Sequence, residues 1–437
     1  MWPYHPDLLA TPVPRYTSFP TAAEFGDIHP THYRDALENI SGEASIYVHI
    51  PFCEKICFYC GCNTGAAGRR SRLETYLDAL HREIDTVAAL LPAGITIGRV
   101  AFGGGSPNAI SPTDFLRLVE ALTRRFRLVD PVYSIELDPR SMSSEWASAI
   151  NTVRIRRASL GVQTFAPHCQ ERIGRIQSGE LIVDTVHRLR NAGIDSLNFD
   201  LMYGLPGQTC DDLTDSMERT CLLGADRIAL FGYAHVPHIV PRQKAIDDRG
   251  LPDQSERFAM AEAGHDYFIT RGYTPVGFDH FALSGGDPLA HAALTGELRR
   301  NFQGFTDDKA PNLIGLGASA ISSLPHLLAQ NEKNSGRYRM RASAGHLVAN
   351  RGVSRSADDR ARGDIIESLL CKGSARLSSD LIEHCRAGLR PFLDKGLATL
   401  CDDRLTITAG GLPYTRTIAA LFDPYRQVSP RRFSSAV

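Results

Sequence analysis

Four of the ten cysteines in the chain lie within ten residues of one another, in the segment "IPFCEKICFYCGCNT" (50–64). Cys53, Cys57 and Cys60 form a C-x3-C-x2-C pattern, and Cys62 adds a C-x-C to it. Thiols at this density can form a disulfide framework, a zinc site, a redox dithiol or the ligand set of an iron–sulfur cluster. The rest of the sequence is needed to choose among these four kinds of site.

The composition restricts the choice. The chain has 437 residues and a net charge of −1, with 43% apolar and 22% charged residues, which is ordinary for a globular protein. Neither nucleic acid nor a membrane is expected as a partner, because there is no excess charge, no basic leader and no apolar run of roughly 18–20 residues. We expect a cytoplasmic protein, where thiols stay reduced and a cysteine cluster binds metal or catalyses.

The spacing favours a catalytic cluster over the other metal sites. Zinc usually recruits two close pairs of ligands, and no second C-x2-C pair follows the one at Cys57 and Cys60. A ferredoxin cluster takes four cysteine ligands. Three close thiolates can hold three irons of a 4Fe-4S cluster and leave the fourth open, as a catalytic metal requires. A zinc knuckle remains the alternative at this point.

Six short apolar runs alternate with helical patterns, and the cysteine segment follows the first of these runs. Their nearly continuous apolar character suits parallel strands that are covered on both faces. Six strand-then-helix units predict an α/β fold, an incomplete (βα)6 TIM-like barrel. Ser111 is expected to begin one of the helices and Gly193 to end another. The expected strands are "SIYVHIP", "GRVAFGGG", "YSIELDP", "RASLGVQ", "SLNFDLMYGLP" and "DRIALFGYA".

Polar residues and glycines gather at one end of these strands. In barrels of this type the carboxyl ends of the strands build the active site. Several separate motifs therefore converge on one face. They are Cys53, 103–105, Glu136, Gln163, Asp200, Tyr233 and His235, in the order of the strands that they follow.

The chain divides into four expected regions. Residues 1–45 form an N-terminal extension, and 46–275 form the barrel. Residues 276–350 have little simple periodicity and are expected to be a layer appended over the barrel. Residues 351–437 read as helices followed by a hairpin, which predicts a small winged-helix-like domain that packs against the barrel. A DNA-binding regulator that uses this last domain is a weak alternative.

The cysteine spacing, with Tyr59 before the third cysteine, resembles the signature of the radical S-adenosylmethionine enzymes. Within that superfamily the chain is similar to the oxygen-independent coproporphyrinogen III oxidases, more loosely from about residue 350 onward. The segments that carry the resemblance are "PRYTSFPTA", "YVHIPFCEKICFYCGCN", "GGGSP", "IELDPR", "LGVQTF", "FDLMYGLPGQT", "FGYAHVP", "GFDHFA", "RRNFQGFT" and "GLGASAIS".

The resemblance implies a reaction. Members of the family convert two propionates of coproporphyrinogen III to vinyl groups, giving protoporphyrinogen IX for haem synthesis without molecular oxygen. The cofactors implied are a 4Fe-4S cluster and two molecules of S-adenosylmethionine, and a 5′-deoxyadenosyl radical removes hydrogen from the propionate β-carbon. A one-electron donor such as flavodoxin or ferredoxin is expected as a partner, and the family suggests a monomer.

The resemblance also implies residue roles. Cys53, Cys57 and Cys60 match the cluster ligands, and Cys62 matches a cysteine outside the cluster that activity requires. Arg15, Tyr16, Arg299 and Arg300 are possible contacts to a tetracarboxylate substrate. Contacts to the cluster-bound S-adenosylmethionine correspond to Tyr47, Gly104, Glu136 and Ile321, and contacts to the second molecule to Tyr59, Gly105, Ser106, Gln163, Arg175, Asp200 and Ala234.

Some residues depart from the family pattern, and other readings stay open. Ser106 and Asn108 stand where better-known members carry threonine, and Gly232 replaces an asparagine. Haem-chaperone relatives are the main alternative, although they usually lack a cysteine at the position of Cys62 and the "RYTSFP" segment. A relative that degrades haem and an electron-transfer protein with a fully ligated cluster are further alternatives.

Overall fold

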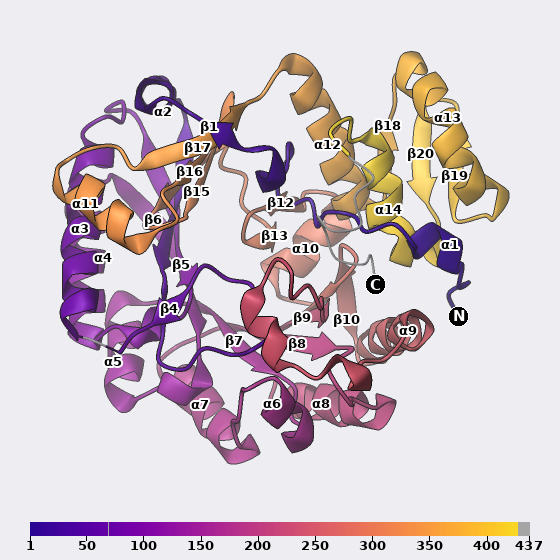
Figure 1. Ribbon diagram of the computed structural model, residues 1–437, viewed down its shortest axis with the longest axis horizontal. Helices are drawn as coiled ribbons and strands as arrows, with labels where there is room; N and C mark the ends of the chain where they lie inside the picture. Colours follow the sequence, from indigo (N-terminus) through magenta and orange to yellow (C-terminus); the bar gives the residue numbers. More distant parts are fainter. Residues whose placement is uncertain (69, 427–437) are drawn as a thin grey trace.

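The computed structural model describes residues 1–68 and 70–426. Its main feature is one mixed sheet of 13 strands that curves around a central space, with helices on its outer side (Figure 1). In the described part of the chain no helix is both long and apolar enough to cross a membrane.

Six neighbouring strands of this sheet are parallel, and each is followed by a helix, so the expected (βα)6 unit is present. The strands are β2 (Glu43–Ile50), β5 (Thr96–Gly104), β6 (Leu128–Leu137), β7 (Arg157–Gln163), β8 (Ser196–Tyr203) and β9 (Arg227–Gly232). The main helices after them are α3 (Arg70–Ala88), α4 (Pro112–Arg125), α5 (Ser144–Val153), α7 (Gly179–Asn191), α8 (Cys210–Leu222) and α9 (Gln254–Thr270).

Local sequence signals explain where these elements start and stop. Six of the eight residues of β2 are buried, as expected for a strand covered on both faces. The Ser111 side chain accepts a hydrogen bond from the Asp114 amide and caps α4, with Pro112 in the first turn. Gly193 follows α7 with φ +94°, a conformation that glycine adopts without strain.

The region 276–350 does not form a layer over the barrel, and that prediction is wrong. Its strands extend the sheet instead, at both edges, and β10 crosses the boundary expected at residue 275. Periodicity could not reveal this, because it identifies an apolar strand without identifying the strand that it pairs with. On the β2 side follow β14 (Asn312–Leu316), β15 (Ile321–Leu324), β16 (Leu327–Asn331), β17 (Ala349–Ser354) and β1 (Gly26–Asp27), and on the β9 side β11 (His280–Leu283) and β10 (Tyr273–Val276).

Short elements of the same region lie between the sheet and the C-terminal part of the chain (Figure 1). They are α10 (Pro288–Thr295) and the hairpin of β12 (Arg299–Asn301) and β13 (Gly304–Thr306), while α11 (Ser335–Ser343) packs on α3. Just beyond the hairpin, Asp307 accepts hydrogen bonds from Arg99 and Arg157, at 2.7 and 2.9 Å to one carboxylate oxygen. These bonds tie the region to β5 and β7.

The C-terminal region has the expected order of helices followed by a hairpin. Its elements are α12 (Ala357–Lys372), β18 (Ser374–Arg376), α13 (Ser379–Asp394), β19 (Ala398–Cys401), β20 (Arg404–Ile407) and α14 (Thr415–Ala419), with β20 in the middle of a three-stranded sheet. One continuous hydrophobic core joins this region to the barrel. The N-terminal segment, with α1 (Pro6–Leu9) and α2 (Pro30–Glu38), runs alongside both (Figure 1).

Candidate active site

The cysteine loop leaves the carboxyl end of β2 and is held at both ends and in the middle. Two short strands, β3 (Phe52–Cys53) and β4 (Gly65–Ala66), pair across it. The Ala67 amide donates to the Cys53 carbonyl at 2.9 Å, and the Phe58 amide donates to the Ile173 carbonyl at 2.9 Å. Backbone hydrogen bonds therefore position the loop.

The four thiols of the loop differ in their surroundings. Cys57 is buried, Cys53 and Cys60 are half-buried, and Cys62 is exposed. A hydrogen bond from the Cys62 thiol lowers the pKa of Cys60 to about 6, and the same bond raises the pKa of Cys62 well above its usual value. A lowered thiol pKa favours the thiolate form that a metal ligand needs.

The geometry fits a cluster better than a single ion. The sulfurs of Cys53, Cys57 and Cys60 do not all lie within 4.8 Å of one another. Three thiolates on one tetrahedral zinc would have their sulfurs only about 3.8 Å apart, given zinc–sulfur bonds of about 2.3 Å. Thiolates that each bind a different iron are spaced more widely. The spacing of these three sulfurs therefore fits an iron–sulfur cluster better than a single zinc ion.

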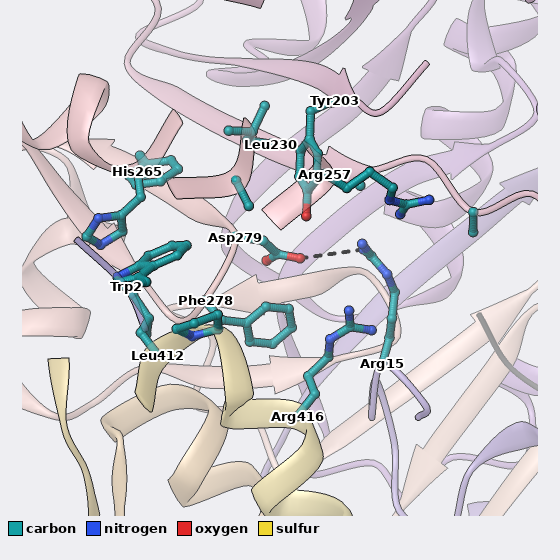
Figure 2. Close-up of a pocket in the computed structure, with 15 residues that line it drawn as sticks. Trp2, Arg15, Tyr203, Leu230, Arg257, His265, Phe278, Asp279, Leu412 and Arg416 are labelled. Atoms are coloured by element: carbon teal, nitrogen blue, oxygen red, sulfur yellow. Dashed lines mark ion pairs between the residues drawn. The ribbon is translucent and has the colours of Figure 1, made fainter. Parts of the chain in front are cut away.

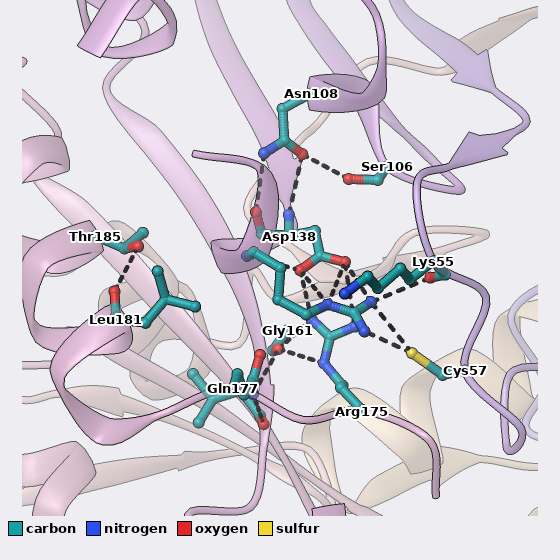
Figure 3. A network of polar contacts seen from close by, with 12 residues as sticks. Lys55, Cys57, Ser106, Asn108, Asp138, Gly161, Arg175, Gln177, Leu181 and Thr185 are labelled. Atoms are coloured by element: carbon teal, nitrogen blue, oxygen red, sulfur yellow. Dashed lines mark hydrogen bonds and ion pairs between the residues drawn. The ribbon is translucent and has the colours of Figure 1, made fainter. Parts of the chain in front are cut away.

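Two arginines contact the buried sulfur of Cys57, and Figure 3 shows one of them, Arg175, beside it. An Arg140 nitrogen lies 3.4 Å and an Arg175 nitrogen 3.3 Å from this sulfur. Asp138 holds both guanidinium groups, at 2.6 Å from Arg140 and 3.3 Å from Arg175. Burial alone would raise the pKa of Asp138, but the two arginines outweigh it and lower the pKa. The carboxylate therefore stays ionised and orients both donors toward the sulfur.

Arg175 contacts protein groups that its sequence motif did not predict. Arg175 was expected to bind a carboxylate of the second S-adenosylmethionine. In this structure its guanidinium group donates hydrogen bonds to Asp138 and to the carbonyl of Gly161. Asp138 and Arg140 were not identified. The signal that could have found them is "LDPR", a carboxylate and an arginine placed directly after a strand of the barrel.

Ser106 helps to hold the hydrogen-bond network around Asp138 in place. It is buried, and its hydroxyl donates to the Asn108 side-chain oxygen at 2.5 Å. The Asn108 amide in turn donates to the Asp138 carbonyl at 2.9 Å. The predicted role of Ser106 in cofactor binding thus stays a prediction, and in this structure its hydroxyl bonds to protein.

The glycines after β5 pack tightly against neighbouring protein atoms. The Gly104 amide donates to Glu136 at 3.0 Å, and Gly104 itself has φ +116°. A Cβ atom on Gly104 would lie 2.6 Å from the ring of His49, and one on Gly105 would lie 2.6 Å from the Phe52 carbonyl. Glycine is therefore required here by the protein's own packing, whether or not a ligand also approaches.

Two carboxylates face the cavity inside the barrel. This cavity measures about 360 Å³ and is lined by Glu136, Asp200 and Phe231, among others. The surrounding protein raises the pKa of Glu136 to about 7, partly offset by the Gly104 amide. Burial also raises the pKa of Asp200, although Asn198 and Ser159 donate hydrogen bonds to it at 2.8 and 3.1 Å. Both groups can accept hydrogen bonds from hydroxyls or an amino group of a ligand.

The remaining predicted residues lie around the same edge of the sheet. The Gln243 side chain donates to the carbonyls of Tyr59 and Ala234, at 2.9 and 3.0 Å, and so joins the cysteine loop to the segment after β9. Gln163 ends β7 with φ +69° and is buried. Ile321 begins β15, two strands beyond β2.

Tyr47 lies on β2 and contacts a neutral histidine. Its hydroxyl is 3.1 Å from His49 Nδ1, and burial lowers the pKa of His49 to about 4. The other ring nitrogen of His49 lies 3.2 Å from the Asn63 carbonyl, in the cysteine loop. The ring therefore links β2 to the loop without carrying a charge.

Comparison with known proteins agrees with this arrangement. The model of the radical SAM superfamily matches residues 47–220, which contain the cysteine loop and most of the parallel strands. A solved structure described as coproporphyrinogen III oxidase (HemN) from Escherichia coli, a radical SAM enzyme, superposes with a TM-score of 0.90. It is 32% identical and covers 97% of this chain and 100% of its own. The fold and the site thus define a radical SAM protein.

Curated relatives identify the family to which the chain belongs within the radical SAM superfamily. The oxygen-independent coproporphyrinogen III oxidase of Bradyrhizobium diazoefficiens is 38% identical, over 97% of each chain. That of Paracoccus denitrificans is 39% identical, over 94% of each chain. The chain belongs to the family of oxygen-independent coproporphyrinogen III oxidases. The family and the fold class expected from the motifs are confirmed.

Proposed function

We propose that the protein oxidatively decarboxylates two propionate side chains of coproporphyrinogen III to vinyl groups, giving protoporphyrinogen IX in haem synthesis without molecular oxygen. The observation that carries the proposal is the similarity to oxidases of this name over 97% of the chain, with the cysteine loop intact at the edge of the barrel. The cavity inside the barrel, which Glu136 and Asp200 line, supplies a place for the reacting groups.

Cys53, Cys57 and Cys60 would hold a 4Fe-4S cluster. When bound, the cluster and S-adenosylmethionine supply a 5′-deoxyadenosyl radical, which is the chemistry of the cofactors themselves. The chain provides binding and orientation. Cys62 matches a family cysteine outside the cluster that activity requires, and it would act next to the cluster rather than as a fourth ligand.

Two sets of contacts to S-adenosylmethionine follow from the family roles. The Glu136 carboxylate and the Gly104 backbone would receive the cluster-bound molecule together with Tyr47 and Ile321. The second molecule would lie near the region where Gln243 brings Tyr59 and Ala234 together. This second set would also use Gly105, Ser106, Gln163, Arg175 and Asp200.

The partners are part of the proposal. Removing a hydrogen atom and carbon dioxide from each propionate leaves one electron to dispose of, and generating each radical consumes one electron. A one-electron donor such as flavodoxin or ferredoxin is proposed, together with a monomeric state.

The test is an anaerobic assay of the protein with reconstituted cluster, using coproporphyrinogen III, S-adenosylmethionine and a reductant. We expect protoporphyrinogen IX and 5′-deoxyadenosine from the wild-type protein. Cys57→Ala should lose the brown chromophore and at least 1,000-fold in turnover, roughly the loss expected when an essential catalytic group is removed. Cys401→Ala, which changes an exposed cysteine on β19, is the matched control and should keep both. Formation of 5′-deoxyadenosine without any vinyl product would reject the substrate and keep the superfamily assignment.

A further inference from the structure

Three arginines from separate parts of the chain, Arg15, Arg257 and Arg416, line one pocket at the rim of the barrel together with Asp279. Asp279 lies 3.6 Å from Arg15, and the charge of Arg300 also acts on it. Arg416 is close enough to Arg15, Arg300 and Asp279 to interact with each of their charges. Arg257 completes the group from α9 (Figure 2). We call Arg15, Arg257 and Arg416 the arginine cluster, and Arg300 lies next to it.

The arginine cluster lies at the catalytic edge of the sheet. Tyr203 and Gly232, which line the same pocket, are the last residues of β8 and β9. The Arg15 guanidinium stacks on Phe231 at 4.7 Å from the ring centre, and Phe231 also lines the cavity inside the barrel. A single aromatic side chain therefore connects the pocket with the space in which the reaction is proposed to occur.

Among the described residues that line this pocket, three arginines face a single carboxylate. Asp279 is the one acidic residue among its described lining residues, and it also pairs with His280 at 2.6 Å. Within residues 1–68 and 70–426, Arg257 Nε is buried in this pocket without a hydrogen-bond partner, as is Asp279 Oδ2, which lies 3.6 Å from Arg15. Buried cations are normally paired with anions, because removing them from water is costly. Burial and Arg15 lower the pKa of Arg416 to about 10, as expected where cations crowd together.

We propose that the arginine cluster binds a carboxylate of the substrate, namely a propionate side chain that is not reacting at the time. The inference rests on the proposed function and names a part of its substrate site. The pocket, at about 50 Å³, has room for a carboxylate group but not for a macrocycle. The ring would lie toward Phe231 and the barrel cavity, and the apolar side chains of Trp2 and Phe278 would pack on the methylene groups.

Gly232 contributes to the shape of the pocket. A Cβ atom at this position would lie 2.8 Å from the Tyr203 hydroxyl and 3.2 Å from an Arg257 nitrogen. The glycine therefore leaves room for both polar groups beside the strand end. Figure 2 shows the Tyr203 hydroxyl pointing toward Asp279, with Arg15, Arg257 and Arg416 on the same side. An unreacted propionate held here would keep the macrocycle in one orientation.

The test measures binding of coproporphyrin III, the stable oxidised form that carries the same four propionates. Trp2 lines the pocket and is one of two tryptophans, so quenching of its fluorescence in a Trp146→Phe background measures the Kd of the porphyrin, and the arginine variants then locate the site. Arg257→Gln and Arg416→Gln should each raise Kd about 10- to 100-fold, since each removes a charge-assisted hydrogen bond. Arg257→Lys should recover part of the affinity.

Two controls separate a local effect from a folding defect. Arg386→Gln changes an exposed arginine of α13 that pairs with Glu383, and it should leave Kd unchanged. The tetramethyl ester of coproporphyrin III should bind the wild-type protein as weakly as the acid binds the variants, which tests the charge without any mutation. Equal binding of acid and ester, or unchanged Kd in both folded glutamine variants, would overturn the proposal.

The outcome distinguishes this inference from the proposed function. If coproporphyrinogen III is converted but the KM of the Arg257 and Arg416 variants equals that of the wild type, the carboxylate site is wrong and the function stands. If no vinyl product forms while binding still depends on both arginines, the carboxylate site stands and the proposed reaction fails.

Discussion

The Cys57 sulfur is the buried one of the three expected ligands, and two charged donors reach it. Hydrogen bonds to a ligand sulfur stabilise the extra electron of a reduced iron–sulfur cluster and so raise its reduction potential. Arg140 and Arg175 can supply this effect only in a fixed orientation, and Asp138 provides it. These residues act on the cluster through Cys57, so we regard them as positioning residues.

We predict that Arg140→Leu lowers the reduction potential of the reconstituted cluster, because the sulfur loses one charged donor. An anaerobic redox titration followed by EPR measures the potential directly. Arg124→Leu, an exposed arginine of α4 that pairs with Glu120, should leave it unchanged. An unaltered potential in the Arg140 variant, with the cluster fully loaded, would mean that this hydrogen bond does not reach the sulfur in the holoenzyme.

At the scale of elements, a buried glutamate joins four segments on the β2 side of the sheet. Glu83 of α3 accepts hydrogen bonds from the Gly317 amide at 2.7 Å, from Asn331 of β16 at 2.7 Å and from Tyr338 of α11 at 2.6 Å. These bonds hold α3 and α11 against the strands that neighbour the cysteine loop. Burial nevertheless raises the pKa of Glu83 to about 7.

The raised pKa predicts a pH dependence of stability. Between about pH 4.3, the ordinary pKa of a glutamate, and pH 7 the folded protein holds a proton on Glu83 that the unfolded chain releases. Stability from this group is therefore present below pH 4.3 and decreases as pH rises to 7. Between pH 5 and pH 8 the wild-type protein should lose about 3 kcal/mol of unfolding free energy because of Glu83. The Glu83→Gln variant should not show this loss. Urea denaturation at the two pH values measures this difference.

The matched control for this experiment is Glu120→Gln on the exposed face of α4. This control should show the same pH dependence as the wild type. Glu136, whose pKa is also raised to about 7, contributes a similar dependence and remains in both variants. A Glu83→Gln protein with the full wild-type dependence would show that Glu83 is already ionised in the folded state at low pH.

At the scale of the whole molecule, the N-terminal segment fastens the C-terminal region to the barrel. The Tyr16 hydroxyl donates to Asp423 at 3.0 Å, and Arg300 donates to the carbonyls of Arg15 and Tyr16 at 3.2 Å each. The Tyr414 hydroxyl, near α14, donates to the Pro3 carbonyl at 2.7 Å. Arg15 and Arg416 of the arginine cluster come together only because these segments meet.

We expect Tyr16→Phe to destabilise the protein by about 2 kcal/mol, because it removes a buried hydrogen bond to a carboxylate. Hydrogen exchange of the first 20 residues should also accelerate. Tyr4→Phe is the control, since that hydroxyl bonds to Gln254 at the exposed surface and should contribute little. Equal exchange in the two variants would show that Tyr16 does not hold the segment in place.

The parts of the structure that depend on local sequence could be predicted. The cysteine loop, the six parallel strands and the cap at Ser111 follow from spacing and from residue types within a few turns of chain. The pairing of β14 with β2 could not be predicted, because those strands are more than 250 residues apart and many apolar strands could fill that edge.

By itself the sequence determined the chemistry of the cysteine loop, since three thiols at this spacing are brought together by the loop alone. The tertiary structure decided what surrounds them. Asp138 and Arg140, which follow β6, meet at Cys57 with Arg175, which lies between β7 and α7, and the arginine cluster draws on segments from Arg15 to Arg416. Such contacts arise when distant elements pack and desolvate one another, and no local pattern encodes which charged groups will then face each other.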